Sequence, residues 1–339
     1  MKILFITLSN IGDCFLSLPA LDSLLAVYPK AEVTVMCGRR CAGIFEGNFY
    51  IKRCIIYERK ISFLRRLGFL FELRNGRYDL VVDLRNSAIP LFLKAKYKTY
   101  PWVNAPRKIA HRSNRHLYKV EPFIRPLAIK AKFVPTEPGS RLFAGNKPDE
   151  LLFKKSLCIS DQDRRSADNL LNEVNISRSD KFILVSPGAR SHIKRWPEDK
   201  FAELNNRLIQ DFKVKVLIVG DEGDFSVCAA VQAKIPSGAL NICAKTSLKS
   251  LAGLMEKASL IISNDSAVMH LASYLDRPVL AVFGPTDYQK YGPWGRSFEV
   301  VHSRLECSPC EIAQCSLGSL KCMEDINVDE VYAAAKKLL

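Results

Sequence analysis

Short apolar runs alternate with amphipathic stretches along the first half of the chain. Apolar runs of about 4–8 residues between turn-forming residues are typical of strands, whereas apolar positions three or four residues apart indicate helices. This pattern predicts strands at residues 2–8, 32–37, 53–57, 80–83 and 108–110, and helices at residues 15–27, 61–74 and 88–95. Strands that alternate with helices build parallel sheets from βαβ units.

The same alternation returns in the second half, after a stretch between residues 123 and 148 that is interrupted by proline and glycine. It predicts strands at residues 182–186, 214–219, 240–242, 260–262 and 279–283, and helices at residues 161–172, 198–211, 225–234 and 328–339. A chain of 339 residues exceeds the usual size of one domain. We therefore predict an α/β fold of two Rossmann-like, doubly wound domains that face a cleft, with the boundary near residue 155.

A polar segment, residues 263–272, separates two apolar runs of the second half. Asp265 lies where the strand at 260–262 is expected to stop and a helix to start. A helix N-terminus offers free N–H groups to phosphate or ribose oxygens, so this segment is a candidate nucleotide site. The alternative is that Asp265 only caps the helix and that His270 is an interior histidine.

The loop after the first predicted strand is a second candidate. It reads Ser9-Asn10-Ile11-Gly12-Asp13. Gly12 permits a close approach of the backbone, and Asp13 stands at a helix start that points toward the predicted cleft. Asp13 as a simple helix cap is the alternative.

Two loops of the second half complete the candidates. The strand at 182–186 runs into Pro187-Gly188-Ala189-Arg190 and then Lys194-Arg195-Trp196-Pro197. Backbone N–H groups followed by a lysine form a workable phosphate cradle, although Lys194 and Arg195 as solvated charges are the alternative. The next strand ends at residues 220–223, where a carboxylate is placed to accept hydrogen bonds from a ribose. Neither G-x-G-x-x-G nor G-x-x-x-x-G-K-[ST] occurs, which disfavours dinucleotide dehydrogenases and P-loop enzymes.

Positive charge is concentrated in the first half. The chain has a net charge of +15, and residues 1–150 hold 26 Lys and Arg against 12 Asp and Glu. Cations between residues 94 and 132 alternate with Tyr97, Tyr100, Trp102, Tyr118 and Phe123. Such a surface attracts nucleic acid, anionic lipid or an acidic substrate, and a solvated face without a partner is the alternative.

The cysteines point to a reducing compartment. Eleven cysteines are scattered along the chain, many near apolar segments, which suits reduced thiols in the cytoplasm. No apolar run approaches the length of a membrane span, and the N-terminus lacks the features of a signal peptide. Near the C-terminus, Cys307, Cys310, Cys315 and Cys322 leave two interpretations open, a zinc or iron–sulfur site or a structural or redox-sensitive loop, and we favour the loop.

Five motifs occur together in one order: residues 9–13, Ser186-Pro187-Gly188, residues 194–197, Asn264-Asp265-Ser266 with Met269-His270-Leu271-Ala272, and Phe283-Gly284-Pro285-Thr286-Asp287. In this order and spacing the chain resembles glycosyltransferase family 9, the bacterial heptosyltransferases. The resemblance implies a glycosyltransferase B fold, with the acceptor on residues 1–155 and ADP-heptose on residues 156–326. It further implies that heptose is transferred with inversion to the lipopolysaccharide inner core, and that residues 327–339 form a helix packed back on the first domain.

The resemblance also implies roles for individual residues. Asp13 matches the general base, Lys194 the phosphate-binding lysine and Glu222 the ribose-binding carboxylate. Residues implied or expected to hold the nucleotide sugar are Ser186, Gly188, Ala189, Arg190, Glu222, Asp265, Ser266, Ala267, Val268 and His270, and those expected to contact the acceptor are Asn10, Gly12, Arg85 and Arg112. One position departs from the family, which commonly has glycine where this chain has Ala267, and this leaves the identity of the sugar open.

These roles require no metal and no cofactor, because Lys194 and a helix N-terminus suffice to stabilise a departing diphosphate. As partners we expect the lipopolysaccharide acceptor and the anionic inner face of the inner membrane, without nucleic acid, and we expect a cytoplasmic, peripheral monomer. Two alternatives remain: an enzyme of the same fold that transfers or epimerises another nucleotide sugar, and a non-enzymatic binder of nucleic acid or anionic lipid.

Overall fold

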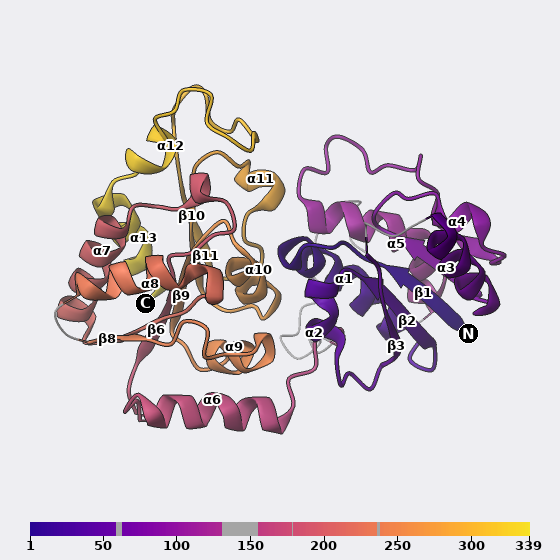
Figure 1. Cartoon of the computed structure of the whole chain (residues 1–339), viewed down its shortest axis with the longest axis horizontal. Coiled ribbons are helices and arrows are strands. Elements are labelled where there is room, and N and C mark those ends of the chain that lie inside the picture. The colour runs from indigo at the N-terminus through magenta and orange to yellow at the C-terminus, as the bar shows by residue number, and fades with distance from the viewer. Residues whose placement is uncertain (59–62, 131–154, 178, 236–237) are drawn as a thin grey trace. The chain divides into compact units, whose positions relative to one another are not determined.

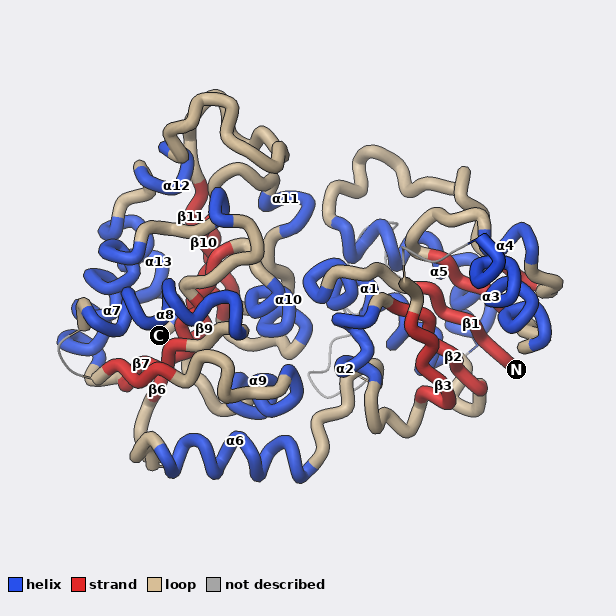
Figure 2. Tube along the Cα trace, in the orientation of Figure 1, coloured by secondary structure: helices blue, strands red, loops and turns tan. Residues whose placement is uncertain are grey.

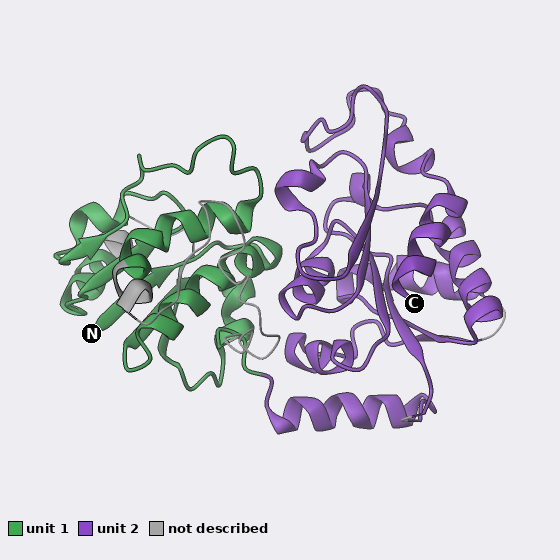
Figure 3. Cartoon of the chain, turned by 180° about the vertical axis from the view of Figure 1, so that it is seen from behind, with its two compact units in different colours: residues 1–158 green, residues 159–339 purple. Residues whose placement is uncertain are grey.

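The computed structural model describes residues 1–58, 63–130, 155–177, 179–235 and 238–339. The chain divides into two compact units, Met1–Cys158 and Ile159–Leu339, coloured separately in Figure 3. Each unit has one parallel sheet with helices connecting its strands, as Figures 1 and 2 show. Among the described residues, no helix combines the length and apolarity needed to cross a bilayer.

The first unit has a five-stranded parallel sheet in the order β3-β2-β1-β4-β5. Its elements are β1 (Lys2–Ile6), α1 (Ile11–Val27), β2 (Glu32–Cys37), η1 (Arg39–Cys41), α2 (Ala42–Phe45), β3 (Ile51–Ile56), α3 (Phe63–Asn75), β4 (Leu80–Asp83), α4 (Ile89–Phe92), β5 (Tyr97–Lys98) and α5 (Arg112–Lys130). Residues 3–6 of β1 are fully buried because helices cover both faces of a doubly wound sheet. One face packs against Leu73 of α3, and α1 packs along α5.

The second unit has a six-stranded parallel sheet in the order β11-β10-β9-β6-β7-β8. Its elements are α6 (Asp161–Glu173), β6 (Phe182–Ser186), η3 (His192–Lys194), α7 (Glu198–Phe212), β7 (Lys215–Ile218), η4 (Glu222–Asp224), α8 (Phe225–Ala233), β8 (Ala239–Asn241), α9 (Leu248–Met255), β9 (Leu260–Asn264), α10 (Ala267–Tyr274), β10 (Val279–Phe283), α11 (Tyr288–Tyr291), β11 (Phe298–His302), α12 (Lys321–Glu324) and α13 (Val328–Leu338). The fully buried Trp196 packs with α7, α8 and α13 on one face of this sheet.

The first unit extends past the predicted boundary at residue 155. The side-chain amide of Asn48 donates to the carbonyls of Lys155 and Ser156, and the Asp22 carboxylate accepts the Ser156 backbone N–H at 2.7 Å. These bonds hold residues 155 and 156 on the first unit, which ends at Cys158.

The structure corrects two of the predictions and adds elements that were not predicted. Residues 108–110 are not a strand, and the fifth strand is β5, only two residues long. Helix α5 and strand β11 were not predicted. Helix α5 runs through Pro122 and Pro126, where the stretch interrupted by proline and glycine was expected to begin. Most of that stretch, residues 123–148, lies outside the described residues. Helix α13 was expected to pack on the first domain, but it belongs to the second unit, where Val331 and Ala335 join the core beside α7 and β10.

Candidate functional site

Both sheets have a point at which the winding direction reverses. In the second unit, β6 lies between β9 and β7, so the chain leaves β6 on one side and returns as β9 on the other. In the first unit, β1 and β4 stand in the same relation. Ligands of such sheets bind outside the carboxyl ends of the strands at this switch point. The loops after β6 and β9 and the loops after β1 and β4 are therefore candidate sites, one set in each unit.

Lys194 and Asp265 meet at the switch point of the second unit. The Lys194 Nζ donates to Asp265 Oδ2 at 2.6 Å, and the two side chains are 31% and 8% exposed. The Lys194 charge is therefore paired with a carboxylate, and the side chain keeps about a third of its surface exposed. Asn264 belongs to one of the five motifs but was not predicted as a site residue. It connects the same loops: its amide donates to the Pro187 carbonyl at 2.7 Å and its oxygen accepts the Trp196 N–H at 3.1 Å. A buried asparagine at the end of an apolar strand was the available signal.

Arg195 and Asp224 form a second pair beside Gly188. Arg195 Nε donates to the Ala189 carbonyl at 3.0 Å, and its guanidinium lies 3.5 Å from Asp224 Oδ1. Burial raises the pKa of the Asp224 carboxyl, with a further rise from the nearby Asp221 charge. Arg195 thus holds the loop after β6 in place through its bonds to Ala189 and Asp224, and it is not a solvated charge. Asp224 was not predicted as a site residue.

Gly188 is required by this arrangement, because a Cβ atom there would overlap the Asp224 carboxyl group. We expect Gly188→Ala to lower the free energy of unfolding by about 1–3 kcal/mol, the usual effect of overpacking. Urea unfolding followed by circular dichroism measures the change. Gly43→Ala is the matched control, since nothing lies within 4 Å of a Cβ at Gly43. Equal stability of the two variants would contradict the tight fit.

The other residues predicted to bind the nucleotide sugar differ in how exposed they are and in which element they belong to. Ser186 and Ala189 are buried, whereas Arg190 and Glu222 are exposed. Ser266 caps α10 by accepting the Val268 N–H at 3.2 Å. Ala267 and Val268 therefore form the first turn of α10, and the His270 ring stands 5.8 Å from that of Trp294.

Asp13 lies in the first turn of α1, directly after the β1 loop. Its carboxylate accepts a hydrogen bond from the Asn10 side-chain amide at 3.0 Å. Gly12 is helical, so its predicted role as a loop residue is corrected. The glycine that packs closely against this loop is Gly38, directly after β2, where a Cβ would lie 2.8 Å from the Ser9 Cα.

Arg85 lies in the loop after β4, the neighbour of β1 at the switch point. The buried Asp83 carboxylate shapes this loop by accepting the N–H groups of Arg85 and Ser87 at 2.8 and 2.7 Å. The Arg85 guanidinium stacks 4.3 Å from the Tyr57 ring centroid, and among the described residues its buried Nη1 has no hydrogen-bond partner. Arg112 is exposed at the start of α5.

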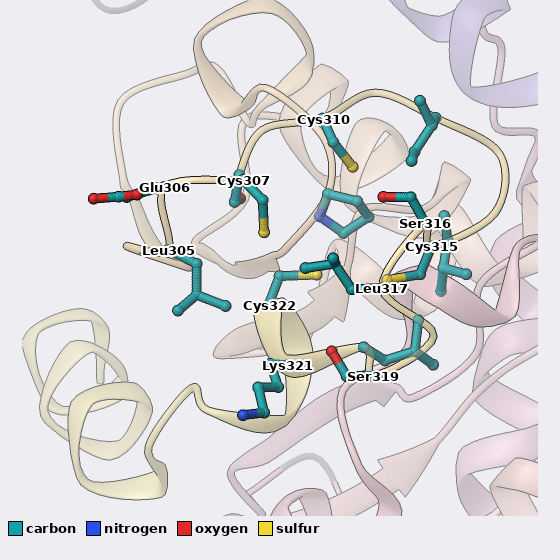
Figure 4. A pocket seen from close by; sticks show the side chains of 15 residues that line it. Leu305, Glu306, Cys307, Cys310, Cys315, Ser316, Leu317, Ser319, Lys321 and Cys322 are labelled. Carbon is teal, nitrogen blue, oxygen red and sulfur yellow. The ribbon is translucent and has the colours of Figure 1, made fainter.

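A cavity of about 450 Å³ lies in the segment 305–322, next to Ile193 and Pro285. Figure 4 shows the four cysteines of the C-x₂-C-x₄-C-x₆-C pattern around it. Within the part of the chain that the structure describes, no three His, Cys, Asp or Glu side chains are placed to hold a metal ion together. The backbone N–H groups of Leu320 and Leu317, together with those of Ser319 and Gly318, lower the pKa of Cys315, whereas burial raises that of Cys322.

We expect iodoacetamide to alkylate Cys315 faster than Cys322 at about pH 7, because the thiolate is the nucleophile and a lower pKa gives more thiolate. Burial slows Cys322 at every pH, but the difference in thiolate fraction shrinks once the pH rises above the lowered pKa of Cys315. The rate ratio should therefore narrow between about pH 7 and pH 10. Mass spectrometry of peptides over time measures both rates. A ratio that does not change with pH would contradict the assigned difference.

The comparisons with known proteins agree with this architecture. The family model of glycosyltransferase family 9 (heptosyltransferase) matches residues 66–321. Lipooligosaccharide heptosyltransferase 2 of Campylobacter jejuni is 25% identical over 346 residues, which cover 100% of this chain and 99% of the relative. Lipopolysaccharide heptosyltransferase 2 of Salmonella typhimurium is 29% identical and covers 84% of this chain and 83% of its own length.

Solved structures show the same fold. The family 9 glycosyltransferase of Veillonella parvula superposes with a TM-score of 0.79 at 22% identity, covering 99% of this chain and 96% of that one. The ADP-heptose lipopolysaccharide heptosyltransferase II of Escherichia coli superposes with a TM-score of 0.71 at 24% identity, covering 100% and 98%. With a family model that spans most of both units, the chain belongs to glycosyltransferase family 9, the heptosyltransferases.

Proposed function

We propose that the protein transfers heptose from ADP-heptose, with inversion, to the inner core of lipopolysaccharide. The observation that carries the proposal is the Lys194–Asp265 pair, which stands on the loops after β6 and β9 at the switch point of the second sheet. Relatives over the whole chain and over 84% of it are named lipooligosaccharide and lipopolysaccharide heptosyltransferases, which supports this choice of sugar and acceptor.

The donor belongs to the second unit in this proposal. Lys194 and the N-terminus of α10 bind the diphosphate, because a cation and free backbone N–H groups stabilise phosphate oxygens. Gly188, Ala189 and Arg190 follow β6 and contribute backbone N–H groups. The exposed Glu222 accepts hydrogen bonds from the ribose hydroxyls. No metal takes part in this proposal, since charge on the leaving group meets Lys194 directly.

The acceptor belongs to the first unit. Asp13 removes the proton from the acceptor hydroxyl as its oxygen bonds to the anomeric carbon. The bond between that carbon and the phosphate oxygen breaks on the opposite side, so the configuration inverts and ADP leaves. Asn10 orients the Asp13 carboxylate through its 3.0 Å hydrogen bond. Arg85, whose buried Nη1 has no hydrogen-bond partner among the described residues, is available to an acceptor phosphate or carboxylate.

We further propose that the enzyme acts as a monomer at the cytoplasmic face of the inner membrane, where a lipid-anchored acceptor is exposed. The excess of cations in the first unit supports this location, because anionic headgroups attract Lys and Arg.

Mass analysis of reaction products tests the function. ADP-heptose is incubated with a series of truncated lipopolysaccharide acceptors, and UDP- and GDP-hexoses serve as control donors. The expected result is addition of one heptose to one acceptor of the series, with release of ADP. Transfer from a control donor alone would identify an enzyme of the same fold with another sugar. Absence of any product would overturn the proposal.

A further inference from the structure

A segment of the first unit without acidic residues lies between Asp83 and Glu121. Its 37 residues contain nine Lys or Arg and no Asp or Glu. The part at residues 91–108, here called the 91–108 surface, comprises the end of α4, the edge strand β5 and the loop that follows. None of these residues is among those proposed to bind the donor or the acceptor.

The 91–108 surface exposes an unusual number of large apolar side chains. Trp102 is 65% exposed and Phe92 is 58% exposed. The exposed set consists of Leu91, Phe92, Tyr97, Tyr100, Trp102 and Val103. No other segment of this length, in the ranges that the structure describes, exposes as many. Monomeric proteins rarely leave such side chains together in water unless they contact a partner or a membrane.

A fixed backbone displays these side chains. Buried Leu93, Thr99 and Ile109 anchor the segment to the unit. The Lys98 ammonium donates to the carbonyls of Pro90 and Leu93 at 3.3 and 3.2 Å, which holds β5 to α4. The residues between these buried anchors lie at the surface, and they include the large apolar side chains of the exposed set.

Tyr100 and Trp102 stack with their ring centroids 5.0 Å apart. Cations lie among these aromatic side chains. Lys94, Lys96, Arg107 and Lys108 are exposed, and none of the four takes part in an ion pair among the described residues. Lys98 and Arg115 lie in the same segment without acidic residues, but they form hydrogen bonds to backbone carbonyls. Arg115 donates to the Ile109 carbonyl at 3.2 Å.

We propose that the 91–108 surface binds an anionic lipid bilayer, with Phe92, Tyr100 and Trp102 in the interfacial layer and the cations against headgroup phosphates. Trp and Tyr favour the membrane interface, and apolar area and positive charge together set the strength of peripheral binding. The inference deepens the proposed function, because a lipid-anchored acceptor is met at a bilayer.

Two other occupants fit less well. A nucleic acid pairs with the cations and stacks on the aromatic rings, but it leaves the aliphatic Leu91 and Val103 in water. A second copy of the chain would bring the same four cations against one another, and like charges oppose association.

Vesicle binding by the whole chain, without donor or acceptor, tests the proposal. Sedimentation measures binding to vesicles of phosphatidylethanolamine with phosphatidylglycerol and to vesicles of phosphatidylcholine alone. We expect Phe92→Ser/Trp102→Ser to weaken binding to the anionic vesicles by about tenfold or more. Phe49→Ser/Phe71→Ser is the matched control, since these side chains are 79% and 64% exposed elsewhere in the same unit.

Charge is tested separately. Lys94→Glu/Lys108→Glu should weaken binding at low salt, with a difference that fades as salt screens the charges. Lys30→Glu/Arg40→Glu changes the charge of the unit equally at exposed positions outside the surface, and it should retain more binding than the Lys94/Lys108 variant. Emission from Trp102 should shift to the blue with anionic vesicles, and Trp102→Phe should lose the shift.

Wild-type binding by both surface variants, or equal loss in surface and control variants, would overturn the proposal. Binding to single-stranded DNA without binding to anionic vesicles would overturn it in favour of a nucleic-acid partner. Heptose transfer to a water-soluble truncated acceptor is measured in parallel. Transfer without vesicle binding would overturn only the proposed membrane contact. Vesicle binding without transfer would overturn only the proposed function.

Discussion

Replacing Asp13 with asparagine is expected to lower kcat by roughly 10²- to 10⁴-fold, the usual contribution of general base catalysis. Asparagine has the same shape but cannot accept the acceptor proton. The donor belongs to the second unit in the proposal, so its affinity should stay within a few fold. Product formation under saturating donor measures kcat, and calorimetric titration with ADP measures donor affinity.

The isosteric change also separates catalysis from a structural role. Asp13 lies in the first turn of α1, where a negative charge stabilises a helix by about 0.3–1 kcal/mol. A variant with this small loss of stability and a large loss of kcat fits the proposed base. Retention of more than about a tenth of kcat would show instead that Asp13 is only a helix-start residue and would assign the base elsewhere.

We expect the second large effect on catalysis from removal of the Lys194 side chain. Lys194→Ala should lower kcat by about 10²- to 10³-fold, as does loss of one preorganised electrostatic donor, and should weaken ADP binding. The ion pair enlarges the effect, because the variant leaves the 8% exposed Asp265 carboxylate without its cation near the proposed diphosphate.

A double-mutant cycle tests this reason. Asp265→Asn added to Lys194→Ala should restore part of the ADP affinity by removing the uncompensated charge. Lys181→Ala is the matched control, since Lys181 is an exposed lysine that directly precedes β6, at the opposite edge of the same sheet. Donor affinity and turnover that Lys194→Ala leaves unchanged would contradict the phosphate-binding role.

The sequence by itself predicted the two α/β units and most strands of both sheets. Strands β2, β4, β6 and β10 have the predicted bounds, because residues buried on both faces of a parallel sheet leave continuous apolar runs. The candidate loops were also found from sequence, since each follows such a run. Two edge strands were missed: β5 has two residues, and β11, in which only Val301 is buried, has no comparable apolar run.

The tertiary structure decided which of these loops are neighbours. Lys194 and Asp265 are 71 residues apart, and they meet because β9 inserts beside β6, an order set by the helix crossovers and not by any local pattern. The same holds for Arg195 and Asp224, which are 29 residues apart. Helix α13 was placed on the wrong unit for this reason. Periodicity shows which face of a helix is buried, but the surface that covers that face is chosen only when the whole sheet assembles.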